Sequence, residues 1–300
     1  MDANLNHIVI FANLKCVENE IQMFSSNVSK VKSQVQISSL DISDMERYDL
    51  YVKEWLDEID YEQYGTFVIS DNAEICSALK EAGIAYSGLL TEYNQECDFS
   101  NTLYLIEELG DISYDSVEGI WMRFKDIPWT IAQTERLIIR EQTVDDVEEI
   151  YRLYNDFKIK EYVDDLAATL EEEKEYIKDY IRFQYRLCEY GIWAIVEKSS
   201  GKIIGRAGLE QRDDIEGLEI GYVIGRDYRQ KGYAKEAVRA ILEYAREEYG
   251  LDTIHAFTRR DNVESVALLE KFGFAKSGEY CINQKVHDRY DADLHKVVNL

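Results

Sequence analysis

Short apolar runs alternate with longer stretches whose apolar positions recur every three or four residues. In the first part of the chain, the pattern predicts strands at residues 7–11, 66–70 and 84–90 and helices at residues 45–59, 72–82 and about 114–125. Strands that alternate with helices are typical of an α/β layer with a mainly parallel sheet. This part is therefore predicted to be a small α/β domain, with a Rossmann-like arrangement as one form that fits the pattern.

One of these helices has clear boundary residues. Asp71 followed by Glu74 has the spacing of a capping box at its start, and Gly83 suits the left-handed residue that ends many helices. The sequence thus predicts a helix over 72–82 with Asp71 as its cap.

The second part of the chain has a different order of elements. It predicts strands at residues 136–140, 191–198, 202–212, 218–224 and 253–258, and helices at residues 233–248 and 262–272, before a strand-rich end. Between the first two strands, Thr143 with Asp146 and Thr169 with Glu172 mark the starts of two further amphipathic helices. The predicted order is β-α-α-β-β-β-α-β-α-β-β.

A proline separates the two parts. Pro128 is the only proline in the chain, and it can neither continue a helix nor leave the residue before it free to be helical. We therefore predict two domains, residues 1–130 and residues 131–300.

The charge is strongly and unevenly negative. The 300 residues carry 59 acidic and 34 basic side chains, a net charge of −25. Residues 1–130 hold 24 acidic and 8 basic residues, a net of −16, which leaves 35 and 26 in residues 131–300, a net of −9. Such a field disfavours nucleic acid and anionic membranes as partners and favours cationic ones, although solubility alone also explains it.

Other features bear on location. No apolar run approaches the roughly 20 residues of a membrane span, and the N-terminal residues lack the basic and apolar regions of a signal peptide. The five cysteines are odd in number and never spaced as C-x-x-C, which argues against a disulfide framework and a zinc site and predicts a cytoplasmic protein.

The stretch RQKGYA, residues 229–234, is the main candidate for chemistry. It lies between a predicted strand and a predicted helix, and the first backbone N–H groups of a helix bind phosphate readily. Gly232 allows a close approach to the backbone, while Arg229 and Lys231 add positive charge. The stretch is neither a Walker loop nor a G-x-G-x-x-G motif. A solvated basic helix start remains the alternative.

Further motifs carry a family resemblance. RQKGYA follows LEIGYVI, and DNVESVALLEKFGF comes after the next strand. Together they resemble the GNAT acetyltransferase superfamily, whose pyrophosphate-binding motif is [QR]-x-x-G-x-[GA]. With ERLIIRE, they look most similar to the RimJ/RimL-type protein N-acetyltransferases, over about residues 134–285.

The resemblance implies a GNAT-type mixed sheet flanked by helices, with acetyl-CoA as co-substrate. The backbone N–H groups of Lys231, Gly232, Tyr233 and Ala234, with Arg229 nearby, would then hold the pyrophosphate. Val223 and Ile224 would pair with the pantetheine arm, and their strand should splay from the strand at residues 253–258. Asn262 and Ser265 would line the pantetheine side.

Acyl transfer to an amine also needs a base and an acid. Glu219, Gly221 and Val223 share one face of their strand, so Glu219 could remove the proton of the amine, unless it only makes a structural hydrogen bond. Leu269 stands where many superfamily members have a tyrosine acid. Ser265 is our substitute, with water as its rival.

Other polar residues are weaker candidates. His255 is predicted to be a hydrogen-bonded sheet histidine and not a base. The terminal segment offers possible metal ligands, but these fit a polar strand and its turn equally well, and we predict no metal site: His287, Asp288, Asp291, Asp293 and His295.

The first domain faintly resembles the haloacid-dehalogenase-like pattern. That family ends its first strand in an Asp-x-Asp pair, but this chain has Ala12 and Leu14 at those positions. We predict a degenerate domain without phosphatase activity, structural or substrate-guiding.

Two functions remain in view. The first is an acetyl-CoA-dependent N-acetyltransferase acting by direct attack in a ternary complex, on a protein N-terminus or a small cationic amine. The alternative is a catalytically inactive CoA-binding regulatory module. The acceptor pocket is predicted to lie between the loop at residues 158–166 and the C-terminal strands, and an oligomer is possible.

Overall fold

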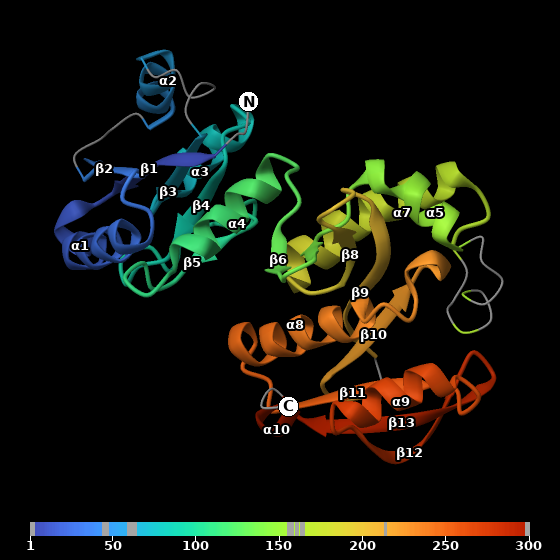
Figure 1. Cartoon of the computed structure of the whole chain (residues 1–300). Coiled ribbons are helices and arrows are strands. Elements are labelled where there is room, and N and C mark those ends of the chain that lie inside the picture. Colours follow the sequence, from blue (N-terminus) through green and yellow to red (C-terminus); the bar gives the residue numbers. More distant parts are fainter. Residues whose placement is uncertain are drawn as a thin grey trace. The chain divides into compact units, whose positions relative to one another are not determined.

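The computed structural model describes residues 4–43, 48–58, 65–154, 159, 162, 166–212 and 215–297. The chain forms two compact units, Met1–Ile127 and Pro128–Leu300 (Figure 1). Across these described ranges, no helix combines the length and the apolar character needed to cross a bilayer.

The N-terminal unit is a parallel sheet between two layers of helices. Its strands are β1 (Leu5–Ala12), β2 (Gln36–Asp41), β3 (Gly65–Ser70), β4 (Tyr86–Leu89) and β5 (Leu105–Ile106), in the order β2-β1-β3-β4-β5. Its helices are α1 (Leu14–Val31), α2 (Tyr48–Glu58), α3 (Ala73–Glu81) and α4 (Tyr114–Phe124). Helices α1 and α4 cover one face of the sheet, and α2 and α3 cover the other.

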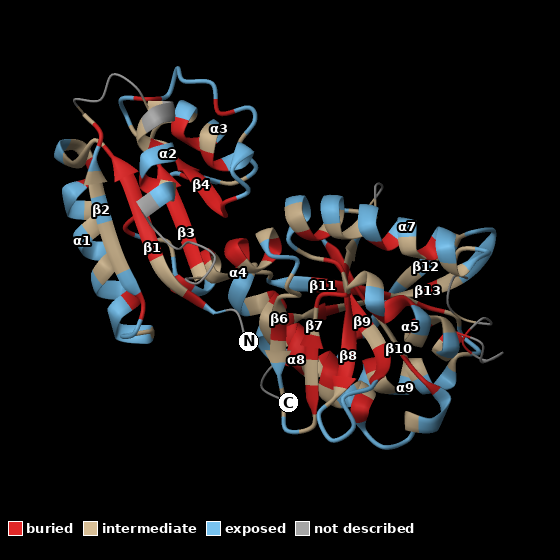
Figure 2. Ribbon diagram, turned by 90° about the horizontal axis from the view of Figure 1, so that it is seen from above, coloured by how far each residue is buried: buried red, intermediate tan, exposed pale blue. Residues whose placement is uncertain are grey.

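This arrangement confirms the predicted parallel α/β layer. Figure 2 shows why its central strands were found: β1 and β3 are buried, as continuous apolar runs predict. Part of the helix predicted at residues 45–59 lies outside the described residues.

The predicted cap of α3 was wrong by one residue. Asn72 is the N-cap, and its side chain accepts hydrogen bonds from the backbone N–H groups of Glu74 and Ile75. Asp71 instead accepts a 2.9 Å hydrogen bond from the backbone N–H of Asn13 and so ties the end of β3 to the start of α1. Gly83 has the predicted left-handed backbone.

The C-terminal unit is built on a mixed sheet of eight strands, ordered β12-β13-β11-β10-β9-β8-β7-β6. The strands are β6 (Thr130–Gln133), β7 (Leu137–Arg140), β8 (Ile192–Glu197), β9 (Ile203–Gln211), β10 (Leu218–Ile224), β11 (Thr253–Thr258), β12 (Ala275–Ile282) and β13 (Lys285–Asp293). The helices are α5 (Val147–Tyr154), α7 (Leu170–Tyr180), α8 (Tyr233–Glu248), α9 (Val263–Lys271) and α10 (Leu294–Val297), with a π-helix, η2 (Ile181–Cys188), continuing α7.

The predicted order of elements is confirmed, apart from β6 and α10, which were not predicted. Both capping boxes are present, at Thr143 with Asp146 and at Thr169 with Glu172. The fold class is therefore the predicted mixed sheet flanked by helices.

The two faces of this sheet bury different helices. The apolar stripe of α8 packs on one face, together with Leu269 and Phe272 from the α9 segment. Residues Ile150 and Tyr154 of α5 pack on the other face, against β8 and β9. Both faces of β8 and β9 are consequently covered (Figure 2).

Strands β10 and β11 form the one parallel pair of this sheet among the described residues, and they separate almost at once. Their ladder contains a single matched pair, Glu219 with His255. Strand β10 stays paired with β9 along its whole length, up to Ile224. The predicted splay of the two strands is confirmed, and it opens a slot in the middle of the sheet.

Candidate active site

The loop beside the slot has the backbone of an anion-binding site. Gly232 is the N-cap of α8, with a φ angle of 84°, and Gln230 is also left-handed at 60°. The first backbone bond of the helix runs from the N–H of Glu236 to the carbonyl oxygen of Gly232. The N–H groups of Tyr233, Ala234 and Lys235 precede it and have no acceptor within the helix. They form the partly positive end of a 16-residue helix.

The side chains of this loop bind the protein itself. Arg229 donates from Nε to the carbonyl oxygen of Ile224 at 3.0 Å, and the Lys231 ammonium lies 5.6 Å from the Tyr228 ring centre. Tyr233 is buried, and its hydroxyl donates to Glu197. These contacts hold the side chains of the segment beside the backbone N–H groups that were predicted to bind phosphate.

Sequence reasoning missed Arg136, which supports this loop. Its Nη1 donates to the carbonyl oxygen of Lys231 at 2.9 Å, and its Nε donates to the Glu236 carboxylate at 2.7 Å. Its guanidinium also stacks on Tyr233, 4.4 Å from the ring centre. Arg136 directly precedes β7 and thus ties this strand to the first turn of α8. Its contact with Glu236 joins residues one hundred positions apart in the sequence.

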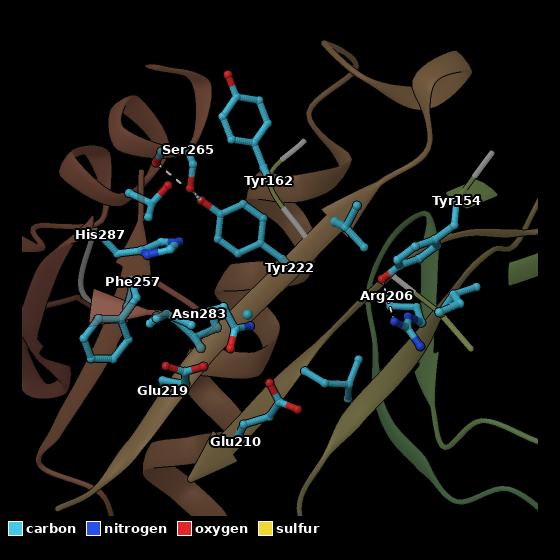
Figure 3. Close-up of a pocket in the computed structure, with 18 of the residues that line it drawn as sticks. Tyr154, Tyr162, Arg206, Glu210, Glu219, Tyr222, Phe257, Ser265, Asn283 and His287 are labelled. Carbon is cyan, nitrogen blue, oxygen red and sulfur yellow. Dashed lines mark hydrogen bonds between the residues drawn. The ribbon is translucent and has the colours of Figure 1, made fainter. Parts of the chain in front are cut away.

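A cavity of about 650 Å³ opens from the slot. It is lined from α5 and α7, from strands β9, β10 and β11, and from the turn between β12 and β13 (Figure 3). Its lining includes Glu219, Val223, Asn262 and Ser265 of the predicted site. Leu166, at the end of the loop predicted to form the acceptor pocket, also lines it, whereas Lys158 lies outside the described residues.

Glu219, the predicted base, faces this cavity but already has a strong partner. Arg212 donates to its carboxylate from Nε at 2.6 Å and from Nη2 at 2.7 Å. The guanidinium in turn lies over the ring of Phe257. A bidentate pair of this kind fixes the orientation of the carboxylate.

A second carboxylate lies beside Glu219. The register of β9 and β10 pairs Glu210 directly with Glu219, and both line the cavity (Figure 3). Like charges opposite each other destabilise a sheet, so this pair makes the region suited to a cation. Sequence alternation along β9 could have indicated Glu210, once the hairpin register was known.

The other side of β10 carries a hydroxyl pair that sequence reasoning also missed. Tyr222 and Ser265 share a 2.9 Å hydrogen bond between β10 and α9 (Figure 3). Burial raises the pKa of Tyr222 to about 12, so its hydroxyl stays protonated at neutral pH. Leu269 is buried next to the cavity, and no acid group stands at that position.

The structure separates the predicted residues into two groups. Glu219, Val223, Asn262 and Ser265 lie around the cavity, with Asn262 capping α9 through the backbone N–H of Ser265. The second group forms the loop and first turn of α8: Arg229, Lys231, Gly232, Tyr233 and Ala234. Ile224 is buried at the end of β10, between the two groups.

His255 of β11 and Asp288 of β13 have partners within the protein. His255 is buried, with Nδ1 2.7 Å from an Asp291 oxygen and Nε2 2.8 Å from the Glu216 carbonyl oxygen. Asp288 pairs with Arg260 and Lys276. His255 is thus a hydrogen-bonded sheet histidine, as predicted.

Comparison with known proteins agrees with this architecture. Residues 136–275 match the family model described as acetyltransferase (GNAT) domain. The chain is 29% identical over 149 residues to "Uncharacterized N-acetyltransferase p20" of Bacillus licheniformis, covering 48% of this chain and 82% of that protein. It is 28% identical over 145 residues to "Uncharacterized N-acetyltransferase YnaD" of Bacillus subtilis, with the same coverage of 48% and 82%.

A solved structure is also similar to this chain. It is a ribosomal-protein-S5-alanine acetyltransferase from Vibrio fischeri, with a TM-score of 0.48 and 19% identity, and the match covers 57% of this chain and 99% of that one.

The family model over residues 136–275 and the relatives named N-acetyltransferases support an N-acetyltransferase. Residues 136–275 form its GNAT acetyltransferase domain.

Proposed function

We propose that this chain transfers the acetyl group of acetyl-CoA to a primary amine by direct attack in a ternary complex. The observation that carries the proposal is the separation of β10 from β11 immediately before the α8 loop, with two carboxylates in the cavity that the slot opens into. A thioester arm entering the slot would bring its carbonyl group between the phosphate-binding backbone and these carboxylates.

The co-substrate is proposed to bind at the predicted positions. The N–H groups at the start of α8 would hold the pyrophosphate. The side of β10 that β11 leaves unpaired, around Val223 and Ile224, would pair with the amide groups of the pantetheine arm. Asn262 and Ser265 would lie along the other side of that arm.

The chemical step requires two proton transfers. The amine nitrogen attacks the acetyl carbonyl carbon, the carbon–sulfur bond breaks, and the electron pair of that bond leaves with sulfur. Glu219 would take the proton that the amine loses, directly or through water. Ser265 would donate a proton to the departing sulfur, Tyr222, hydrogen-bonded to Ser265, would replace that proton, and solvent would return one to Tyr222.

The acceptor class follows from the cavity charge and from the sequence. A pair of facing carboxylates suits an ammonium group before it is deprotonated. A protein N-terminus and a small cationic amine both have such a group. The N-terminal unit is proposed to be structural or substrate-guiding, because Ala12 ends β1 and Leu14 begins α1 where a nucleophilic pair would be needed. A cytoplasmic location stays a prediction.

The test is an acceptor screen with acetyl-CoA. Free thiol release is followed over peptides, amino acids, polyamines and aminoglycosides, and products are identified by mass spectrometry. We expect transfer to at least one amine class. Tight binding of acetyl-CoA with no transfer to any amine would instead support the inactive CoA-binding module.

A further inference from the structure

Arg206 is a cation of the cavity lining that an ammonium acceptor would not need. It lies on β9, directly opposite Val223 of β10. Because side chains alternate along a strand, Arg206, Gly208 and Glu210 share the face that also carries Gly221 and Glu219. This face therefore has a cation at one end and two carboxylates at the other (Figure 3).

The hydrogen bonding of Arg206 is incomplete. Its Nη2 donates to the Tyr154 hydroxyl at 2.5 Å, and its Nη1 makes a long contact of 3.4 Å to Gln142. Its Nε is buried and has no partner among the described residues. Among the described residues, no carboxylate lies within ion-pair distance of the guanidinium. The guanidinium stacks on Tyr154, 4.8 Å from the centre of the ring.

The protein nevertheless keeps this side chain charged. Burial lowers the pKa of Arg206, but the Tyr154 hydroxyl and the nearby Glu173 carboxylate more than offset this effect and raise the pKa above its usual value. A fixed guanidinium with spare N–H groups, turned to a cavity, is the geometry that recognises a carboxylate.

The floor between the charged ends is open over Gly221 and closed over Gly208, which faces it. A Cβ on Gly221 would meet nothing nearer than Ile192 Cδ1 at 3.7 Å, whereas a Cβ on Gly208 would meet the Gly191 carbonyl oxygen at 1.9 Å. The Glu219 level and the Arg206 level are four residues of strand apart, roughly 13 Å between Cα atoms, and both side chains line the same cavity. A small molecule that used both ends would have to lie along this face, over Gly221.

We propose that the acceptor is a free amino acid, whose ammonium group lies at Glu210 and Glu219 and whose carboxylate is bound by Arg206. This inference rests on the proposed acetyl transfer and narrows its acceptor. A polyamine would leave Arg206 unmatched. A peptide would present an uncharged carbonyl group where the carboxylate is expected.

The test compares each amino acid with its own carboxamide, which has the same amine and side chain but no carboxylate. We expect kcat/KM to favour the free acid by about ten- to hundredfold, the usual range for one charge-assisted contact. Tripeptides with the same first residue should behave like the carboxamides. Equal rates for acid and carboxamide, or faster transfer to tripeptides, would overturn the proposal.

Variants separate recognition from folding. Arg206→Gln should remove the preference for the free acid and leave the rates with carboxamides nearly unchanged. Equal loss with both acceptors would assign Arg206 a merely structural role and overturn the proposal. Arg152→Gln is the matched control, because Arg152 is exposed on α5 and does not line the cavity.

A second variant guards against misfolding of the first. Tyr154→Phe keeps the buried ring that stacks on Arg206 but removes the hydroxyl that holds its Nη2. It should reduce the preference for the free acid part of the way towards that of Arg206→Gln, and an unchanged preference counts against the proposal.

Binding supplies a readout that does not depend on turnover. Calorimetry of the full chain with CoA should show tighter binding of the free acid than of its carboxamide. If no acceptor is acetylated, the proposed function fails, and this comparison still decides whether the cavity recognises a carboxylate.

Discussion

Arg212 binds the carboxylate of Glu219 through both of its oxygens, at 2.6 and 2.7 Å. The two residues are seven positions apart on the β9–β10 hairpin, and the guanidinium lies over the ring of Phe257. The two hydrogen bonds fix the orientation of the Glu219 carboxylate toward the cavity and restrict its rotation. Turnover should therefore depend on both residues, in different ways.

Glu219→Gln is expected to lower kcat by roughly a hundredfold or more, the usual contribution of a general base. The dissociation constant of acetyl-CoA should not change, because Glu219 lies away from the α8 loop. Arg212→Gln should lower kcat less, since the carboxylate remains but is no longer oriented. Steady-state kinetics and calorimetry measure these effects. Glu175→Gln, which alters an exposed ion pair of α7, is the control, and full turnover by Glu219→Gln excludes the base assignment.

Gly232 allows a test of the phosphate-binding loop with a matched control. Its φ of 84° strains any side chain, so Gly232→Ala should cost roughly 1–2 kcal/mol of stability and also weaken acetyl-CoA binding by about tenfold. Gly201 has a φ of 67° and open space around it, so Gly201→Ala should cost similar stability without any loss of affinity.

Gly232→Glu should weaken binding further, because it places a carboxylate against the phosphates. Thermal unfolding and calorimetric titration of the three variants distinguish strain from lost binding. Normal acetyl-CoA affinity in Gly232→Glu would remove the loop from the binding site.

Arg136 and Glu236 should act as one unit in acetyl-CoA binding. Each single variant, Arg136→Gln or Glu236→Gln, loosens the contact between the start of β7 and the first turn of α8, so each should weaken binding by a similar factor. The double variant should lose little more than either single one, because the interaction is already broken. The acetyl-CoA affinities of the wild type and the three variants form a double-mutant cycle. If the losses of binding free energy in the single variants add up to the loss in the double variant, the two residues act separately.

Tyr222 and Ser265 give a prediction for the leaving group. Tyr222→Phe keeps the ring but removes the hydroxyl, and it should lower kcat by about tenfold while the KM of acetyl-CoA changes little. Ser265→Ala should lower kcat at least as much, and the double variant should resemble Ser265→Ala. Tyr190→Phe, whose hydroxyl bonds to Gln211 away from the cavity, is the control. Full kcat in both single variants would leave water as the proton donor.

The pH profile adds a second test of the same pair. Because burial raises the pKa of Tyr222 to about 12, its proton is held below that value and lost only above it. The wild-type kcat should therefore show no decline caused by this hydroxyl between about pH 7 and about pH 10. A decline in that range that disappears in Tyr222→Phe would contradict the assignment.

The sequence predicted the parts of this structure that are apolar and local. Strands β10 and β11 agree with prediction to the residue because at least half of the residues in each are apolar and most of their positions are buried or half-buried. Strand β2 was missed because four of the six residues of QISSLD are polar and the strand lies at a sheet edge, where none of its residues is buried. The loop before α8 was predicted from Gly232 and the neighbouring cations Arg229 and Lys231, because such a motif lies within a few consecutive residues.

The long-range contacts around the site could not be predicted from the sequence. Arg136 with Glu236, and Tyr222 with Ser265, join residues far apart in sequence, so their partnership depends on strand register and helix packing. The unpartnered Nε of Arg206 likewise depends on the three-dimensional structure, because its surroundings come from the segment after β7 and from α5 and β9. Charge alone does not distinguish a paired arginine from an unpaired one.

Asp288 gives a prediction about stability and pH. It is buried on β13, and hydrogen bonds from Arg260 and Lys276 hold the pKa of its carboxyl below the usual value of 3.8. A carboxyl group with a lowered pKa in the folded state stabilises the protein above its unfolded pKa, and this contribution disappears as the pH falls through the folded value. Asp288→Asn should therefore be less stable than the wild type at neutral pH, by roughly 1–3 kcal/mol.

The difference should begin to shrink below about pH 4, where the Asp288 carboxyl of the unfolded chain takes up a proton, and should vanish below the lower pKa of the folded state. Amide hydrogen exchange of β13 in the full chain measures the local free energy of opening at each pH. Asp293→Asn is the control: its partner Lys296 is exposed, and such pairs stabilise little, so this variant should follow the wild type throughout. A gap between Asp288→Asn and the wild type that stays constant down to the acid limit would show that Asp288 acts through its shape and hydrogen bonds, and not through its charge.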